Sequence, residues 1–292
     1  MVAKRVLVTG ATGQQGGAVV DALTSGEYGE FAVYGMTRNA EGEAAAALAD
    51  RGVHVVEADM DDRSSLDDAV AGMESVFLVT TFFEAGPEAE AEQGMRVIDA
   101  CADAGVDHVV YSSVASADTA PLDHFASKRR VEEHLADSGL AWTVVRPVYF
   151  MQNFDWLEQD VREGTLAMPL AEGVSLGVVD IADIGRTVGV VLADPDSWVG
   201  ETIDVAGDEL TLAGFAAAFT AALDREVGAI HVDVEAYRAE AGDEMADMYR
   251  WFNEGGYDVD VPELSAWTGI DYVTFADYLD AHWASRPASP AA

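Results

Sequence analysis

The chain has 292 residues, and because half of them are hydrophobic it holds enough apolar material for a folded core, which excludes a disordered acidic protein. It carries 53 Asp and Glu residues against 16 Lys and Arg residues, so its formal net charge is −37. A surface of this sign repels nucleic-acid backbones and anionic membranes, and no run of eighteen apolar residues is present to span a bilayer.

The first half of the chain alternates short apolar segments with segments of helical spacing. Apolar strands separated by helices indicate a parallel sheet that is covered on both faces. We therefore predict an α/β fold, a Rossmann-type doubly wound parallel sheet with a smaller α/β C-terminal substrate lobe. The predicted strands are 5–9, 31–37, 53–58, 75–80, 107–112 and 141–146. The predicted helices are 14–25, 43–51, 64–71, 88–104 and 125–138.

After about residue 150 the elements become shorter, and the acidic, aromatic C-terminal third is expected to be irregular. The sequence predicts a pair of short strands at 165–168 and 174–179, a helix at 181–193, a strand at 201–205 and a helix at 212–223. The expected domains are an NAD(P)-binding domain at 1–152, to which 180–205 returns, a smaller substrate or partner lobe at 153–285, and a flexible tail at 286–292.

A glycine-rich turn, Thr9-Gly10-Ala11-Thr12-Gly13-Gln14-Gln15-Gly16-Gly17, follows the first predicted strand and opens the first predicted helix. Gly10 permits a tight turn, Gly13 leaves space for a phosphate, and Gly16 or Gly17 lets the helix pack on the strand. The free N–H groups at the start of a helix attract an anion. The turn therefore predicts a nucleotide site, with a turn that binds no ligand as the alternative. Its expected contacts are Gly10, Thr12, Gly13, Gln14, Gln15 and Gly16.

The residue type at the end of the second predicted strand indicates whether the dinucleotide is NAD or NADP. An acid there accepts hydrogen bonds from ribose hydroxyls, whereas a base pairs with a 2′-phosphate. Arg38 stands at this place without an acid, and a guanidinium forks well onto phosphate. We therefore predict NADP, with NAD less favoured; in the alternative, Arg38 only pairs at the surface with Glu41 or Glu43. Further cofactor contacts are expected after the third and fourth strands, from Asp59, Met60, Thr80 and Thr81.

Three more segments accompany the turn: Tyr111-Ser112-Ser113, His124-Phe125-Ala126-Ser127-Lys128 and Arg146-Pro147-Val148-Tyr149-Phe150-Met151-Gln152-Asn153-Phe154. Together they resemble the NmrA-like branch of the atypical short-chain dehydrogenase/reductases, and the resemblance extends to about residue 283. It implies a Rossmann domain, a smaller C-terminal domain and a cofactor cleft between them. The family includes NADP-sensing transcriptional co-regulators and reductases of quinones, dyes or phenolic compounds.

One position departs from the pattern of the superfamily. Its ordinary members carry a Tyr four residues before the Lys, and this Tyr protonates the substrate oxygen. Counting back from Lys128 gives His124 instead. Lys128, one of only two lysines, is expected to bind the nicotinamide ribose, the alternative being an exposed helix lysine. His124 is a candidate proton donor or else caps its helix, and Ser112 is a third candidate catalytic residue or an ordinary strand-end serine.

The resemblance also implies that Pro147 and Phe150 lie beside the nicotinamide. Large apolar residues form either a pocket for an aromatic substrate or part of the core. The residues concerned are Phe82, Phe83, Tyr149, Phe150, Met151, Trp156 and Trp251.

Two functions from different classes follow. The first is an NADPH-dependent oxidoreductase that reduces a small aromatic carbonyl or a quinone-type acceptor, because quinones need little help from a protein acid. The second is a non-catalytic NADP(H) redox sensor and transcriptional co-regulator, which the missing Tyr favours. The expected partner is a small-molecule substrate or a protein; direct contact with nucleic acid or membrane is not expected, and an oligomer is compatible with the sequence.

The remaining features concern the environment of the protein. Cys101 is the single cysteine, so no intramolecular disulfide or thiolate metal cluster is expected, no metal site is predicted, and a buried helix position is favoured. The glycine-rich turn begins too early for a signal peptide, which predicts a cytoplasmic protein. Scarce lysine with excess acid resembles the proteins of halophiles, where salt screens the charge.

Overall fold

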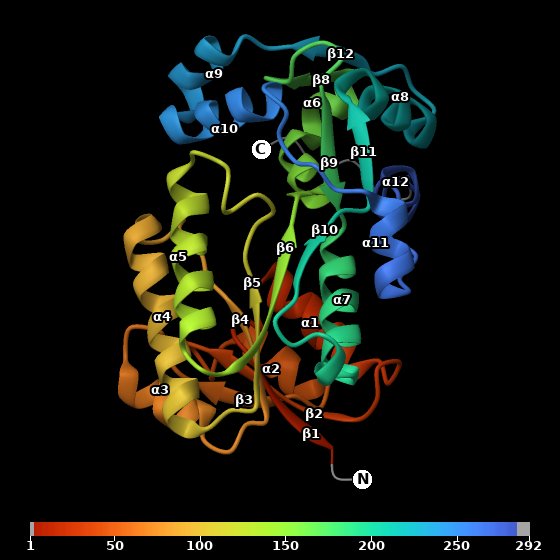
Figure 1. Cartoon of the computed structure of the whole chain (residues 1–292). Coiled ribbons are helices and arrows are strands. Elements are labelled where there is room, and N and C mark those ends of the chain that lie inside the picture. The colour runs from red at the N-terminus through yellow and green to blue at the C-terminus, as the bar shows by residue number, and fades with distance from the viewer. Residues whose placement is uncertain (1–2, 285–292) are drawn as a thin grey trace. The chain divides into compact units, whose positions relative to one another are not determined.

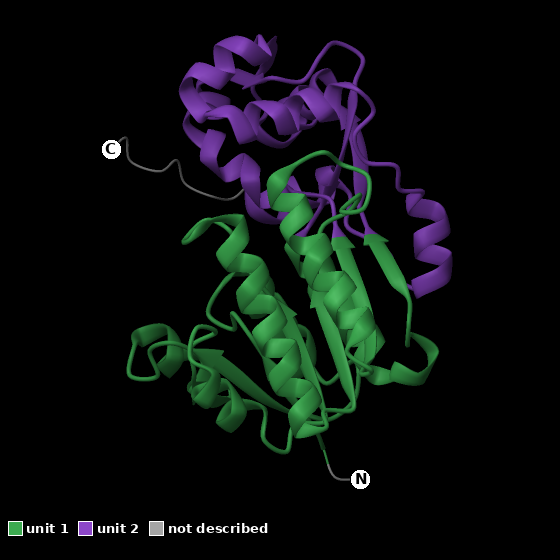
Figure 2. Cartoon of the chain, turned by 60° about the vertical axis from the view of Figure 1, so that its left-hand side comes forward, with its two compact units in different colours: residues 1–146, 181–204 green, residues 147–180, 205–292 purple. Residues whose placement is uncertain are grey.

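The computed structural model describes residues 3–284, which form two compact units (Figure 2). Unit 1 comprises Met1–Arg146 and Ile181–Asp204, and unit 2 comprises Pro147–Asp180 and Val205–Ala292. Each unit has a buried apolar cluster of its own. The tail expected at 286–292 lies outside the described residues.

Unit 1 is built on a seven-stranded sheet with the order β10-β6-β5-β4-β1-β2-β3 (Figure 1). Strand β1 pairs in parallel with β2 and β4, and β3, β5 and β6 extend the parallel pairing outward. The predicted doubly wound parallel sheet is confirmed. The strand order reverses between β1 and β4, where ligands bind outside the carboxyl ends of such strands. The strands are β1 (Lys4–Val8), β2 (Phe31–Thr37), β3 (His54–Glu57), β4 (Ser75–Val79), β5 (His108–Ser112), β6 (Ala141–Pro147) and β10 (Thr202–Val205).

Helices cover both faces of this sheet. Helices α3, α4 and α5 pack side by side on one face, and α1 packs against α7 on the other (Figure 1). Gly185 of α7 permits the close approach, because a Cβ there would lie 2.3 Å from the carbonyl oxygen of Ala18. The elements are α1 (Gln14–Thr24), α2 (Glu43–Asp50), α3 (Arg63–Val70), α4 (Gly86–Ala104), α5 (Asp123–Asp137), α7 (Ile181–Ala193) and the short η2 (Pro195–Ser197).

The core of unit 1 explains why its strands are apolar throughout. All five residues of β5 are buried, because helices remove both faces of the sheet from water. Cys101 is fully buried on α4, which confirms the predicted core position. Burial raises the pKa of its thiol to about 12, so it stays protonated and acts as a small apolar side chain.

Unit 2 holds two small sheets, with strand orders β11-β9-β7 and β12-β8. Strand β9 (Ser175–Val179) pairs in parallel with β7 (Tyr149–Phe150) and antiparallel with β11 (Asp208–Thr211). Strand β8 (Thr165–Met168) pairs in parallel with β12 (Gly228–His231). The strands expected as one pair, β8 and β9, therefore exist but belong to different sheets. The remaining elements of this part of the chain are η1 (Met151–Leu157), α6 (Glu158–Glu163) and α8 (Leu212–Leu223).

From Val234 to His282 the chain is mostly helical, so the expectation of an irregular C-terminal third was wrong. Side chains cap three of its helices at the N-terminus: Asp233, Asp260 and Thr274 each accept a hydrogen bond from a backbone N–H. Each of these three helices has eight residues, too few turns for the apolar spacing to be recognised. The helices are α9 (Val234–Ala241), α10 (Asp243–Asn253), α11 (Val261–Thr268) and α12 (Phe275–His282).

Candidate functional site

The glycine-rich turn of unit 1 connects β1 to α1. Gly10 has a φ of +58°, which favours glycine, and a Cβ on Gly16 would lie 2.2 Å from the carbonyl oxygen of Gly10. The same atom on Gly17 would be 3.8 Å from its nearest neighbour, so Gly16 is the glycine that allows the close packing. Gly13 is the N-cap of α1 and offers no side chain to cover the N–H groups of the first turn. This cradle fits a pyrophosphate.

Two of the predicted residues connect the turn to β5. The Ser112 hydroxyl donates to Oε1 of Gln15 at 2.6 Å, and Ser112 is fully buried. Its only proton is committed to this bond, so the arrangement suits a residue that orients Gln15 better than one that protonates a substrate. Thr12 and Gln14 are exposed at the turn.

Arg38 lies exposed immediately after β2, and its partner is neither of the two acids expected in the surface-pair alternative. Its guanidinium donates to both carboxylate oxygens of Glu84, from Nη1 to Oε2 at 2.7 Å and from Nη2 to Oε1 at 2.8 Å. These hydrogen bonds and the paired charge raise the pKa of Arg38 and lower the pKa of Glu84. The residue selected for the 2′-phosphate is thus held by a carboxylate from the segment that precedes α4.

Asp59 and Met60 form the turn that follows β3. The backbone N–H of Asp59 donates to the Ser65 hydroxyl at 3.0 Å, and its Oδ1 accepts from the backbone N–H of Asp61 at 2.9 Å. Met60 packs against the core cluster of unit 1, and its carbonyl accepts from the guanidinium of Arg96. These bonds fix the backbone at the end of β3, beside the end of β2 that carries Arg38.

A buried polar network surrounds Lys128. Its ammonium donates to Oε1 of Glu90 at 2.8 Å and to the carbonyl of Thr80 at 3.4 Å. Glu90 also accepts from the Thr80 hydroxyl at 3.0 Å and from the Ser127 hydroxyl at 2.6 Å. The Tyr111 hydroxyl lies 3.4 Å from that of Thr80 and donates to it, because Thr80 gives its proton to Glu90. Burial raises the pKa of Tyr111, which keeps this phenol neutral.

This network fixes the ammonium of Lys128 in place. The Glu90 side chain has no exposed surface, so its charge requires the lysine and the two hydroxyls as partners. The Lys128 side chain is 13% exposed. An ammonium has three N–H donors. Among the described residues Lys128 donates to two acceptors, Glu90 and Thr80, which leaves one N–H for a ligand.

Glu84, Glu90 and Ser127 are site residues that the sequence reasoning missed. Glu90 carried a signal, because it lies on the apolar side of α4 with Gly94, Val97 and Cys101, where an acid has no reason to be without a buried partner. Nothing in the sequence singled out Glu84, since it stands in a short connection between Phe83 and Ala85, and an exposed acid there needs no partner.

His124 belongs to a row of rings beside this network. It lies in the first turn of α5, whose N-cap is Leu122, so the capping alternative was wrong. The His124 ring lies 4.8 Å from that of Phe82, which stacks on Phe83 at 4.2 Å. Phe83 is 75% exposed, and Thr81, two residues earlier, is exposed as well. An open aromatic surface therefore adjoins the end of β4.

The other predicted aromatic and cofactor residues lie in unit 2. Pro147 is the last residue of β6, and Phe150 is half-buried in β7. Met151 is a fully buried core residue, whereas Trp156 is 78% exposed. These two positions do not fit the wall of a substrate pocket in unit 2.

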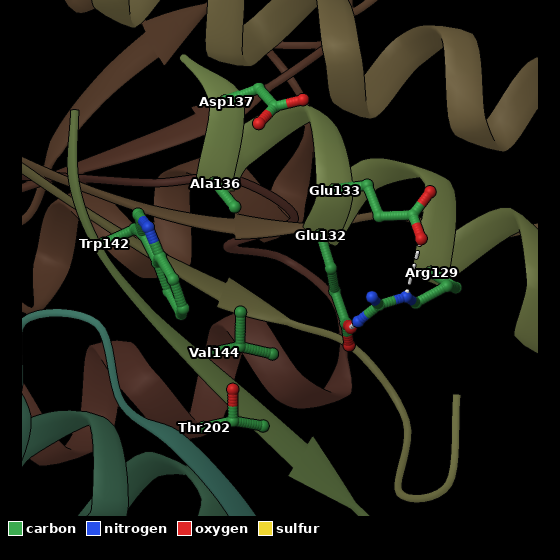
Figure 3. A pocket seen from close by; sticks show the side chains of 8 residues that line it. All are labelled: Arg129, Glu132, Glu133, Ala136, Asp137, Trp142, Val144 and Thr202. Carbon is green, nitrogen blue, oxygen red and sulfur yellow. Dashed lines mark hydrogen bonds and ion pairs between the residues drawn. The ribbon is translucent and has the colours of Figure 1, made fainter. Parts of the chain in front are cut away.

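A pocket of about 370 Å³ lies in unit 1 between α5 and the strands β6 and β10 (Figure 3). On its α5 side, Arg129 pairs with Glu132 and Glu133 of the same helix. None of the predicted site residues lines this pocket. Its lining is Arg129, Glu132, Glu133, Ala136, Asp137, Trp142, Val144 and Thr202.

Residues 3–284 also bear on metal binding and on membrane insertion. No group of three or more His, Cys, Asp and Glu side chains in this range is arranged to hold a metal ion. No helix in the same range is long and apolar enough to cross a membrane.

Known proteins resemble this chain over most of its length. The sequence model of the NmrA-like family matches residues 2–279. The NAD(P)H azoreductase of Xenophilus azovorans is 30% identical over 96% of this chain and 98% of its own length. The crystal structure of an NADPH-dependent quinone oxidoreductase from Escherichia coli, complexed with NADPH, has a TM-score of 0.82 and 27% identity, covering 94% of this chain and 99% of that one. The negative transcriptional regulator NmrA in complex with NADP has the same fold, with a TM-score of 0.81 and 20% identity over 97% and 96% of the two chains.

Proposed function

Because the chain belongs to the NmrA-like family, we propose that it is an NADPH-dependent oxidoreductase that reduces a small aromatic carbonyl or a quinone-type acceptor. The azoreductase and the quinone oxidoreductase reported above support this proposal, since both are reductases and the latter was solved with NADPH. The observation that carries it is the lysine network, which holds a charged donor at the end of β4 beside the glycine-rich turn.

The residues of unit 1 divide the work of holding the cofactor. The N–H groups after Gly13 bind the pyrophosphate, and Arg38 binds the 2′-phosphate with its planar fork. Asp59 and Met60 border the adenine. Lys128 donates its remaining N–H to the nicotinamide ribose, while Thr80 and Thr81 border the nicotinamide end. In unit 2, Pro147 and Phe150 are the proposed nicotinamide contacts.

Bound NADPH supplies the hydride that reduces the acceptor. The ammonium of Lys128 favours the negative charge that develops on an acceptor oxygen, because Glu90 and Thr80 keep it fixed in a site with little water. His124 is the proposed proton donor. Its ring lies next to Phe82, which stacks on the exposed Phe83, and a flat acceptor can stack on the open face of Phe83. Water supplies the proton where the acceptor is a quinone.

Turnover tests this function directly. Purified protein in molar KCl is expected to oxidise NADPH steadily with at least one member of a panel of quinones, azo dyes and aromatic carbonyls. The paired substitution Lys128→Met with Glu90→Gln removes the ammonium and the carboxylate charge together, and it should lower kcat/KM by about a hundredfold. If the protein bound NADPH tightly but turned over no member of the panel, the proposed oxidoreductase activity would be wrong.

A second function, an NADP(H) sensor and transcriptional co-regulator, is favoured by one observation. The ordinary Tyr proton donor is replaced by His124, whose ring is buried between Phe82 and Phe125. For a sensor, cofactor occupancy must shift the protein between two surfaces. A pull-down from cell extract whose captured protein changes when NADP⁺ is added, with no turnover, supports this function in place of the first.

The acidic surface belongs to the same proposal. A cytoplasmic protein of a halophile meets molar salt, in which the Debye length is about 3 Å and a net charge of −37 is screened. The described surface pairs are made mostly by Arg, in keeping with only two lysines in the chain. A melting temperature that does not rise between 0.2 and 3 M KCl contradicts this part of the proposal.

A further inference from the structure

The contact between Arg38 and Glu84 joins the end of β2 to the segment 80–85 between β4 and α4. Both N–H groups on one edge of the guanidinium are used, at 2.7 and 2.8 Å, and the two side chains are 63% and 58% exposed. A phosphate group binds Arg through the same parallel pair of N–H bonds. Glu84 therefore already holds the Nη1/Nη2 edge of Arg38, one of the two edges through which a guanidinium can bind a phosphate.

We propose that Glu84 is a specificity-determining residue whose carboxylate competes with the 2′-phosphate of NADP(H) for Arg38, so that phosphate binding releases the segment 80–85 from β2. This inference rests on the proposed function, which assigns the 2′-phosphate to Arg38. NADH carries no such phosphate and binds without breaking the pair. Glu84 thus lowers the affinity for NADP(H) and leaves the affinity for NAD(H) unchanged.

The negative charges around Arg38 favour replacement of the Glu84 carboxylate by the 2′-phosphate over binding of both groups at once. Asp59 and Asp61 also face the guanidinium closely enough to raise its pKa. The negative charge of Asp61 is partly compensated by Arg96, whose Nη1 lies 3.1 Å from Oδ1 of Asp61. A phosphate with nearly two negative charges cannot be added to this acidic group while the carboxylate of Glu84 stays in contact. The phosphate displaces it because the doubly charged group is the stronger acceptor.

The released segment carries part of the aromatic row. Glu84 directly follows Phe83, and Phe82 stacks on His124. Within the segment, the backbone N–H of Phe83 donates to the Thr81 hydroxyl at 3.4 Å. Thr80 is held by the lysine network and Phe82 by His124, but Thr81, Phe83, Glu84 and Ala85 are all exposed, so the Arg38 contact is the main restraint on the exposed part of this connection. Loss of that contact therefore changes the mobility of the surface on which the acceptor is proposed to stack.

The first experiment measures the affinities for NADPH and NADH in four proteins: the wild type, Glu84→Gln, Arg38→Gln and the double variant. Glu84→Gln is expected to tighten NADPH about twofold to fivefold, the range for an exposed ion pair, and to leave NADH unchanged. Arg38→Gln is expected to weaken NADPH about tenfold or more. In the Arg38→Gln background the gain from Glu84→Gln should disappear.

Glu88→Gln is the matched control. Glu88, on the helix α4 that follows the segment, makes a similarly exposed two-bond pair with Arg130 of α5, at 2.7 and 3.0 Å. This variant should change neither affinity. An equal gain from Glu84→Gln with and without Arg38 means general repulsion of the phosphate and overturns the competition.

Different results contradict the proposed phosphate site and the proposed competition. If Arg38→Gln leaves NADPH binding unchanged, the proposed phosphate site is wrong. If Arg38→Gln weakens NADPH but Glu84→Gln has no effect, only the competition is wrong. Hydrogen exchange measured by mass spectrometry gives a second reading: peptides that cover 82–86 should exchange faster with NADP⁺ than with NAD⁺ at saturation. Equal exchange in the two complexes overturns the release of the segment.

Discussion

Two pairs of a cation and a carboxylate stand in unit 1 at the proposed cofactor site, and they differ in burial more than in chemistry. The side chains of Lys128 and Glu90 are 13% and 0% exposed, whereas those of Arg38 and Glu84 are 63% and 58% exposed. An ion in the interior cannot replace a lost partner with water, but an ion at the surface can. The first pair is therefore part of the fold, and the second is free to exchange its partner for a ligand.

The largest expected effect comes from breaking the buried pair. Lys128→Met leaves the Glu90 carboxylate buried without its counter-charge, and we expect a loss of about 3–5 kcal/mol in the free energy of unfolding. Denaturant unfolding of the full chain in molar KCl measures this. Adding Glu90→Leu should restore part of the loss, because it removes the unpaired buried charge, although the Thr80 and Ser127 hydroxyls then lose their acceptor. A single variant as stable as the wild type contradicts the buried pair.

His108 extends the comparison to a buried group that has no ionic partner. Its Nε2 lies 2.9 Å from the Thr143 hydroxyl, which itself donates to the carbonyl of Trp198 at 2.6 Å, so Nε2 carries the proton. Its Nδ1 has no hydrogen-bond partner among the described residues. Burial lowers the pKa of His108 to about 4, so the folded protein keeps this ring neutral.

The pH dependence follows from this shift. Between pH 6.5 and 4 the unfolded chain binds a proton at this position and the folded chain does not, so stability is lost as the pH falls through this window. The full shift amounts to about 3 kcal/mol. His108→Gln keeps a donor without the titration and should reduce the difference in unfolding free energy between pH 7 and pH 5. An unchanged difference would mean that His108 is not the group responsible.

Asp204 makes stability depend on pH in the opposite direction from His108. Burial raises the pKa of its carboxyl to about 6, although Arg146 acts to lower it, and Oδ1 has no partner among the described residues. The folded form therefore holds a proton that the unfolded chain releases near pH 4, and stability is lost as the pH rises through 6. Asp204→Asn should raise the unfolding free energy at pH 8 by about 1–2 kcal/mol and have little effect at pH 4. A destabilised variant at pH 8 would show that the ionised carboxylate is needed.

The same comparison explains what the sequence predicted and what it did not. The glycine-rich turn and the parallel strands depend on local spacing, and they were predicted to within two residues. The partners of Arg38 and Lys128 lie 46 and 38 residues away, and no local pattern selects Glu84 or Glu90 from 53 acids. Glu90 was recognisable only as an acid on the apolar side of a helix. The short C-terminal helices were missed because their stability comes from caps and from the shared core around Phe154 and Phe275.

The smallest expected effect on stability comes from the exposed pair, Arg38 and Glu84. The effects of this pair should depend on salt concentration, whereas those of the buried pair, Lys128 and Glu90, should not. Arg38→Gln and Glu84→Gln should each change the free energy of unfolding by less than about 1 kcal/mol. Between 0.2 and 2 M KCl the gain in NADPH affinity from Glu84→Gln should shrink, because at 1 M salt screening acts within about 3 Å in water. The cost of Lys128→Met should stay constant, because ions do not enter the interior. If both effects fell together with salt, burial would not be what distinguishes the two pairs.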